Sequence, residues 1–168
     1  MWTENNYSTL PADTLFDALV KDLSHLLSKD DHPITTLANA AAFIFSSVEQ
    51  INWAGFYLFD GKQLYLGPFG GKPACTTIAI GSGVCGTAAA KKETVVVEDV
   101  DAFPGHIVCD GNSRSEIVVP LLKNDGSLYG VLDIDSPVIA RFGEAEKKGF
   151  EKLAVVILEK IDKTAILL

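Results

Sequence analysis

The cysteines are the residues of this sequence best suited to chemistry, and Cys109 has the most unusual setting. It lies in the turn-rich stretch DAFPGHIVCDGNSRSEIVVP, residues 101–120, with His106 and Arg114 close by in sequence. Structural cysteines are usually small buried apolar groups, so a thiol among polar residues favours a reactive role. The thiolate is the nucleophile, and a neighbouring cation or a helix start lowers the cysteine pKa from about 8.5 toward neutrality. Cys85, predicted at the start of a short helix, has the same advantage.

Acidic residues form a second group that could do chemistry. Asp133 and Asp135 are two positions apart in the predicted strand VLDIDS, so strand alternation places both side chains on one face. Clustered carboxyl groups raise one pKa among them, and a carboxyl that keeps its proton near neutral pH can act as a proton donor. From the residues alone, two solvated carboxylates at a strand end remain an open alternative.

Two further motifs point to other chemistry. The stretch GSGVCG, residues 81–86, satisfies the G-x-G-x-x-G pattern of dinucleotide binding, but the flanking segments predict hairpins instead of strand–helix–strand crossovers. We interpret it as a strand-to-helix turn that needs glycine backbone angles and whose N–H groups suit an anion such as an amino-acid carboxylate. The cysteines and His106 are candidate zinc ligands, but they form no C-x-x-C pair. We expect neither a metal site nor a cofactor.

Composition limits the classes of partner. The chain has 168 residues, 48% of them hydrophobic and 21% charged, as is typical of a single globular domain. Its 14 basic and 22 acidic residues give a net charge of −8, which argues against a nucleic-acid partner. No apolar run is long enough for a membrane span, and the polar N-terminus shows no secretory signal. We therefore expect a cytoplasmic protein in which cysteines serve chemistry rather than a disulfide scaffold.

The predicted elements follow the order of an α+β domain. Helices are indicated where apolar residues recur at three- and four-residue spacing, and hairpins where two apolar runs flank the dipeptide Asp-Gly at residues 60–61 and 125–126. The predicted helices span residues 13–29, 33–50, 84–92 and 143–168, and the strands outside the hairpins span residues 75–80 and 94–99. We expect one domain over residues 1–168, a mainly antiparallel sheet of about six strands with the N- and C-terminal helices packed on one face.

Four stretches of the chain carry a resemblance to a known family. In order they are NWAGFYLF, GPFGGKPACTTIAIGSGVCGTAA, DVDAFPGHIVCDGNSRSEIVVPL and GVLDIDSP, within residues 52–142. Together they closely resemble the free methionine-(R)-sulfoxide reductases, which are stand-alone GAF-domain enzymes. The resemblance implies a GAF-like fold and the thioredoxin-dependent reduction of free L-methionine-(R)-sulfoxide to methionine.

The resemblance also implies a role for each candidate residue. Cys109 matches the catalytic cysteine, whose thiolate attacks the sulfoxide sulfur, releases methionine and becomes a sulfenic acid. Cys75 matches the residue that resolves this acid as a disulfide, with Cys85 as an alternative or second exchange partner, and thioredoxin restores the dithiol. The remaining matches line the substrate pocket: an aromatic wall of Trp53 and Tyr57, and acidic residues Glu116, Asp133 and Asp135 that meet the ammonium and sulfoxide groups.

The chemistry of the reaction agrees with this set of residues. Sulfoxide reduction by a thiol needs a thiolate, a proton donor for the departing oxygen and a second thiol that rescues the sulfenic acid. One alternative stays open: GAF domains also act as small-ligand sensors, and a redox sensor without catalysis could use the same thiols. A sensor normally needs an output domain, for which 168 residues leave no room. GAF domains often dimerise through their terminal helices, so a homodimer is one possible assembly.

Overall fold

A six-stranded antiparallel sheet forms the centre of the computed structural model, which describes residues 5–7, 9–105 and 111–161. The strands lie in the order β3-β2-β1-β6-β5-β4, and each neighbouring pair is antiparallel. Their bounds are Trp53–Phe59 for β1, Gln63–Gly71 for β2, Thr77–Ala79 for β3, Val95–Val97 for β4, Ser115–Leu122 for β5 and Leu128–Ser136 for β6. The predicted antiparallel sheet is confirmed.

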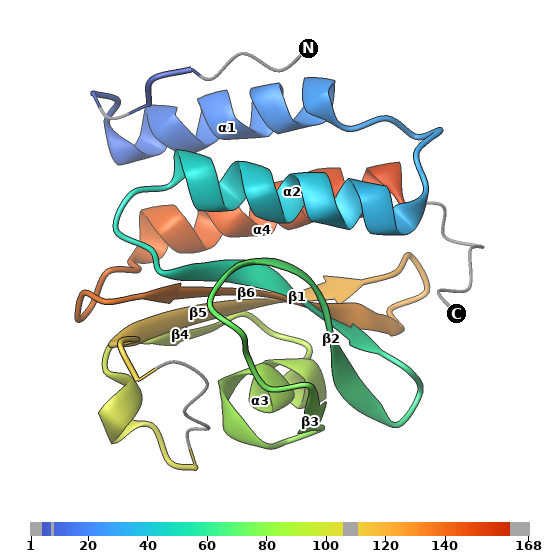
Figure 1. The fold of residues 1–168 in the computed structure, drawn as a ribbon, viewed down its shortest axis with the longest axis vertical. Coiled ribbons are helices and arrows are strands. Elements are labelled where there is room, and N and C mark those ends of the chain that lie inside the picture. Colours follow the sequence, from blue (N-terminus) through green and yellow to red (C-terminus); the bar gives the residue numbers. More distant parts are fainter. Residues whose placement is uncertain (1–4, 8, 106–110, 162–168) are drawn as a thin grey trace.

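Three helices cover one face of this sheet. They are α1 (Ala12–Leu26), α2 (Pro33–Ser47) and α4 (Glu144–Lys160). Figure 1 shows α2 and α4 against the sheet and α1 stacked on them, so the terminal helices pack on one face as predicted. Where α1 meets α4, Gly149 makes room for an aromatic ring, because a Cβ there would lie 2.0 Å from Cγ of Phe16.

The opposite face carries α3 (Gly83–Lys91) and the short 3-10 helix η1 (Val100–Ala102) (Figure 1). A second apolar cluster fills the space between these helices and the sheet. Strand β1 is apolar along its length because both of its faces are buried. Ala54 and Phe56 belong to the core under α2 and α4, whereas Trp53 and Tyr57 belong to the cluster under α3.

The glycine-rich stretch before α3 is a strand-to-helix turn, as interpreted from the sequence. Gly81 and Gly83 have φ angles of +88° and +60°, which residues with side chains rarely adopt. Gly86 meets a steric limit, since a Cβ there would lie 2.3 Å from the carbonyl oxygen of Ala79. The turn places Cys85 in the first turn of α3, over the sheet.

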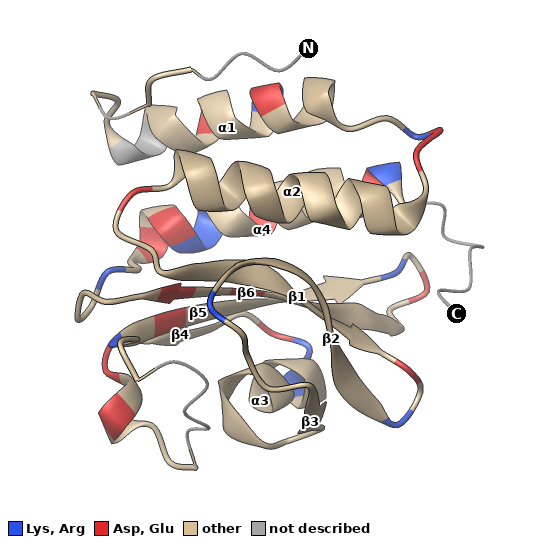
Figure 2. Ribbon diagram, viewed as in Figure 1, with Lys and Arg blue, Asp and Glu red and all other residues tan. Residues whose placement is uncertain are grey.

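Charged residues lie mainly on the helices and connecting segments, but Figure 2 also shows acidic positions within β5 and β6. These two strands are central in the sheet, and acidic residues are rarely buried unless they have partners or a function. Among the described residues, no helix combines the length and the apolar character needed to cross a membrane.

Candidate active site

The strand register gathers the predicted pocket residues on one face of the sheet. Trp53 of β1 pairs with Asp135 of β6, and Asp135 pairs with Glu116 of β5. Residues paired across antiparallel strands point to the same face, so these three side chains form a row on the face that carries α3. Asp133 lies two residues from Asp135 and shares this face, as the alternation predicted.

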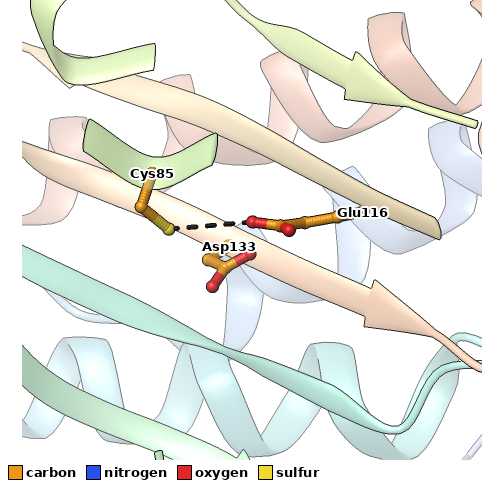
Figure 3. Close-up of side chains that lie close together, drawn as sticks. All are labelled: Cys85, Glu116 and Asp133. Atoms are coloured by element: carbon orange, nitrogen blue, oxygen red, sulfur yellow. Dashed lines mark hydrogen bonds between the residues drawn. The ribbon is translucent and has the colours of Figure 1, made fainter. Parts of the chain in front are cut away.

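Glu116, Asp133 and Cys85 form a compact buried cluster between the sheet and α3 (Figure 3). Only 6%, 6% and 4% of these residues is exposed. The thiol of Cys85 donates a hydrogen bond to Oε1 of Glu116, with 3.9 Å between sulfur and oxygen. The sulfur and one oxygen of each carboxyl lie within 4.8 Å of one another. Thiolates and carboxylates are ligands for divalent metals, so this is where the described residues could hold a metal ion.

Burial raises the pKa of both carboxyl groups. The pKa of Glu116 lies well above its ordinary value because the side chain is desolvated and because Asp133 and Asp135 lie nearby. Desolvation raises the pKa of Asp133 to about 7. Two buried carboxyls this close do not both ionise readily, so the pair keeps a proton at neutral pH and can donate it to a bound molecule. The alternative of solvated carboxylates is wrong for Asp133, whereas Asp135 is half-buried.

Cys85 is a protonated thiol, contrary to the expectation that its place at a helix start lowers its pKa. Desolvation raises the pKa of Cys85 well above its ordinary value, and the charges of Asp133 and Glu116 act in the same direction. The helix dipole contributes about 0.3–1 kcal/mol at an exposed helix end and up to about 2 kcal/mol in a partly buried one, and burial beside two carboxyls outweighs it. In this structure Cys85 is a hydrogen-bond donor to Glu116 rather than an activated nucleophile.

The aromatic residues predicted to line the pocket are buried and stacked. The ring centroids of Trp53 and Tyr57 lie 6.0 Å apart, and Trp53 stacks on Phe69 at 5.3 Å. Their polar atoms bind the backbone of the segment between β2 and β3. Trp53 Nε1 donates to the carbonyl oxygen of Lys72 at 3.1 Å, and the Tyr57 hydroxyl donates to that of Cys75 at 2.9 Å.

Two residues that support this stack were missed at the level of sequence. Phe69 extends the aromatic stack, and Gly55 leaves the space for it. A Cβ at Gly55 would lie 2.3 Å from Cβ of Phe69 and 2.7 Å from Cη2 of Trp53. The available signal was a glycine inside an apolar strand, which often marks the close approach of another group.

The described cysteines are in different chemical states. Cys75 is disulfide-bonded, whereas Cys85 carries a free thiol. Cys75 precedes β3 instead of opening it, because the strand begins only at Thr77. It is half-buried and packs against the apolar cluster under α3, so it shares the face of the sheet that carries the acidic cluster.

The predicted nucleophile and one of its candidate cations, Cys109 and His106, lie outside the described residues. The other candidate cation, Arg114, is described. Its guanidinium donates to Asp101 at 2.6 Å in an exposed ion pair. Arg114 therefore has an acidic partner of its own in this structure.

A separate hollow of about 470 Å³ lies between α4 and β5, on the face of the sheet that α1, α2 and α4 cover. It is lined by both apolar and charged side chains, including Pro120, Glu151 and Val155. None of the predicted site residues that the structure describes lines this hollow.

Removing the Asp133 charge is expected to stabilise the fold at high pH. The pKa of Asp133 is about 7 in the folded protein and about 3.9 in the unfolded chain. Its contribution to the free energy of unfolding is therefore fully present below pH ~4, where the residue is protonated in both states, and is lost as the pH rises through ~7. When the pH is raised from 4.5 to 8, the free energy of unfolding of Asp133→Asn should increase by about 2–4 kcal/mol relative to that of the wild type. Urea unfolding of both proteins at the two pH values measures this, and an unchanged difference would contradict the raised pKa.

Comparison with known proteins identifies the family of this chain. The GAF domain family matches residues 11–157. The chain is 46% identical to the free methionine-R-sulfoxide reductase of Escherichia coli, over 85% of this chain and 86% of that protein. It is 43% identical to the Saccharomyces cerevisiae protein of the same name, over 90% of this chain and 89% of that protein. The structure of free methionine-R-sulfoxide reductase from Neisseria meningitidis in complex with its substrate is 40% identical, covers 95% of each chain and has a TM-score of 0.88. The chain therefore belongs to the free methionine-R-sulfoxide reductases, within the GAF-domain family.

Proposed function

We propose that this protein reduces the R epimer of free L-methionine sulfoxide to methionine. The observation that carries the proposal is Oδ1 of Asp133, a buried acceptor without a hydrogen-bond donor among the described residues. An acceptor buried in this way costs free energy, and the ammonium group of an amino acid would supply the donor. The names of the E. coli and S. cerevisiae relatives support the same substrate.

The surrounding residues suit the other parts of a methionine sulfoxide molecule. The resemblance assigns Trp53 and Tyr57 to the aromatic wall of the substrate pocket, and aromatic rings suit contact with an S-methyl group. The first backbone N–H groups of α3 have no acceptor inside the helix, and a helix start attracts an anion such as the substrate carboxylate. Glu116 and Asp133 together keep a proton at neutral pH, which supports a role for this pair as the proton donor to the sulfoxide oxygen.

The proposed reaction moves one oxygen from the substrate to the enzyme. The Cys109 thiolate attacks the sulfoxide sulfur while the carboxyl pair protonates the oxygen. In net terms, sulfoxide and thiol become thioether and sulfenic acid, so methionine leaves and Cys109 is oxidised. The sulfenic acid then condenses with the Cys75 thiol, and a disulfide and a water molecule form. The dithiol of thioredoxin returns both cysteines to thiols by exchange.

The described cysteines favour Cys75 over Cys85 as the resolving thiol. Cys75 is engaged in a disulfide, whereas the Cys85 thiol is free, buried and bound to Glu116. Attack on a sulfenic acid needs a thiolate, and burial beside two carboxyls keeps Cys85 protonated. Cys85 therefore serves as a donor inside the pocket and at most as a second exchange partner.

Replacing Cys75 with serine is expected to separate the first turnover from the following ones. Cys75→Ser should release about one methionine per enzyme and then turn over at least about tenfold more slowly with thioredoxin, because the sulfenic acid lacks its main partner. Rapid-quench measurement of methionine, with peptide mapping of the oxidised wild type, tests this. The map should join Cys75 to Cys109; a map showing only Cys85 joined to Cys109 transfers the resolving role to Cys85.

Three further points belong to the proposal. Thioredoxin is the reductant, since thiol exchange is the chemistry that reopens such a disulfide. The activity belongs in the cytoplasm, where thioredoxin keeps thiols reduced. A homodimer formed through the terminal helices is the proposed assembly, by analogy with other GAF domains.

Turnover of the separated epimers tests the function directly. In an assay with thioredoxin, thioredoxin reductase and NADPH, the free R epimer should be consumed in many turnovers and the free S epimer should not. The geometry of attack on a bound sulfoxide allows one configuration at sulfur. Stoichiometric oxidation of the thiols without sustained turnover of either epimer would instead indicate a redox sensor and would refute the proposal.

A further inference from the structure

The residue that carries the resolving thiol is bound directly by a side chain of the central sheet. Cys75 lies in the segment that joins β2 to β3. The hydroxyl of Tyr57 in β1 donates to the carbonyl oxygen of Cys75 at 2.9 Å. Three residues earlier, the indole of Trp53 donates to the carbonyl oxygen of Lys72 at 3.1 Å. The segment is therefore tied to β1 at two points through the side chains of the aromatic pair.

The ring of Tyr57 is itself held firmly. Tyr57 is 1% exposed and stacks on Trp53 with 22° between the ring planes. Trp53 stacks in turn on Phe69 with 12° between the planes, and the missing side chain of Gly55 makes this stack possible. Buried side chains that interdigitate in this way occupy rotamer minima and are closely packed. The Tyr57 hydroxyl is therefore held in place by packing, and its hydrogen bond positions the carbonyl group of Cys75.

We propose that Tyr57 is a positioning residue that holds Cys75 ready for disulfide formation. The inference rests on the proposed function, in which the Cys109 sulfenic acid meets the Cys75 thiol. In that step the sulfur–sulfur bond forms, the S–O and S–H bonds break, and water leaves, so no further oxidant is needed. The rate depends on how often the two sulfurs are in reach of each other, and a fixed segment raises that fraction.

The same hydrogen bond protects the enzyme from irreversible oxidation. A sulfenic acid that waits for its partner is exposed to a second oxidant molecule, which converts it to sulfinic acid. Fast condensation with Cys75 removes this risk. Tyr57 therefore acts on the stage after methionine has been released, in addition to any contact that its ring makes with the substrate.

Tyr57→Phe tests the role, because it keeps the stacked ring and removes only the hydroxyl. Tyr129→Phe is the matched control: Tyr129 is also buried in the sheet, at 8% exposed, and its hydroxyl has no hydrogen-bond partner among the described residues. Each reduced protein is oxidised with one equivalent of free methionine-(R)-sulfoxide in the presence of dimedone, which captures sulfenic acids. Mass spectrometry over time then gives the captured sulfenic acid and the disulfide.

A parallel series uses hydrogen peroxide, which forms the same sulfenic acid without methionine sulfoxide. This series tests the positioning role of Tyr57 even if free methionine sulfoxide is not the substrate. Failure of the positioning role and failure of the proposed function are therefore distinguishable. Thermal unfolding of each variant shows that it is folded before the comparison is made.

Tyr57→Phe is expected to form the disulfide about tenfold more slowly than the wild type and to give correspondingly more captured sulfenic acid with both oxidants. Tyr129→Phe should match the wild type. Disulfide formation by Tyr57→Phe at the wild-type rate would overturn the inference. Slower methionine release with an unchanged ratio of sulfenic acid to disulfide would also overturn it, since the hydroxyl would then serve substrate binding alone.

Discussion

Replacing Cys109 with serine is expected to lower kcat/KM for free methionine-(R)-sulfoxide by at least about a thousandfold. A serine hydroxyl is not ionised at neutral pH and cannot form the sulfenic acid on which the proposed cycle depends. In the proposed mechanism no other described thiol takes over the attack, because Cys85 is buried and protonated and Cys75 is the proposed resolving thiol. The measurement is steady-state turnover with thioredoxin, combined with a single-turnover assay for methionine.

A second variant separates the loss of the thiol from the gain of a hydroxyl. Cys109→Ala should be as inactive as Cys109→Ser, and circular dichroism should show that both retain the wild-type fold. Substantial steady-state activity in either folded variant would refute the mechanism and assign the attack to a different sulfur.

Blocking the substrate's amino group is expected to lower kcat/KM by about thirtyfold to several thousandfold. In the proposed complex the ammonium group of free methionine-(R)-sulfoxide lies against Glu116 and Asp133, which are buried and therefore little solvated by water. N-acetylation removes the cation and leaves the carboxyls without this partner, at a cost of ~2–5 kcal/mol. The comparison is kcat/KM for the free and the N-acetylated R epimer.

A double comparison assigns this selectivity to a residue. In the proposed complex Asp133→Asn removes a charge that attracts the ammonium group. The ratio of kcat/KM for the free substrate to kcat/KM for the acetylated substrate should therefore be smaller in this variant than in the wild type. Comparing the two enzymes with the two substrates measures the coupling between Asp133 and the amino group. Equal kcat/KM for free and acetylated substrate in the wild type would mean that the carboxyls do not recognise the amine.

Local pattern was sufficient for most of the fold. Three- and four-residue spacing of apolar side chains indicated the helices that became α1, α2 and α4, and the Asp-Gly dipeptides indicated the hairpins between β1 and β2 and between β5 and β6. The glycine turn before α3 could also be interpreted, since Gly81 and Gly83 adopt the positive φ angles that glycine permits. These features depend on neighbours in sequence, and so a sequence reveals them.

The candidate chemistry was visible for a different reason. A thiol in a turn-rich, polar stretch of sequence at Cys109, and acidic residues at alternating positions in an apolar strand, are unusual in an ordinary core. The resemblance of four stretches to a known family then supplied the substrate and the individual roles, which residue types alone left open. Family membership is confirmed by relatives that match most of the chain.

Only the tertiary structure decided how these residues act on one another. The row Trp53–Asp135–Glu116 comes from strand pairings between segments far apart in the chain, and local periodicity does not encode register. The protonated state of Cys85 follows from desolvation beside two carboxyls, which depends on every element packed around the thiol and reverses the expectation from its helix position. The sequence by itself therefore determined which groups are present and the elements that carry them. Their burial, and with it their proton affinities, was decided by long-range packing, because desolvation is a property of the assembled fold.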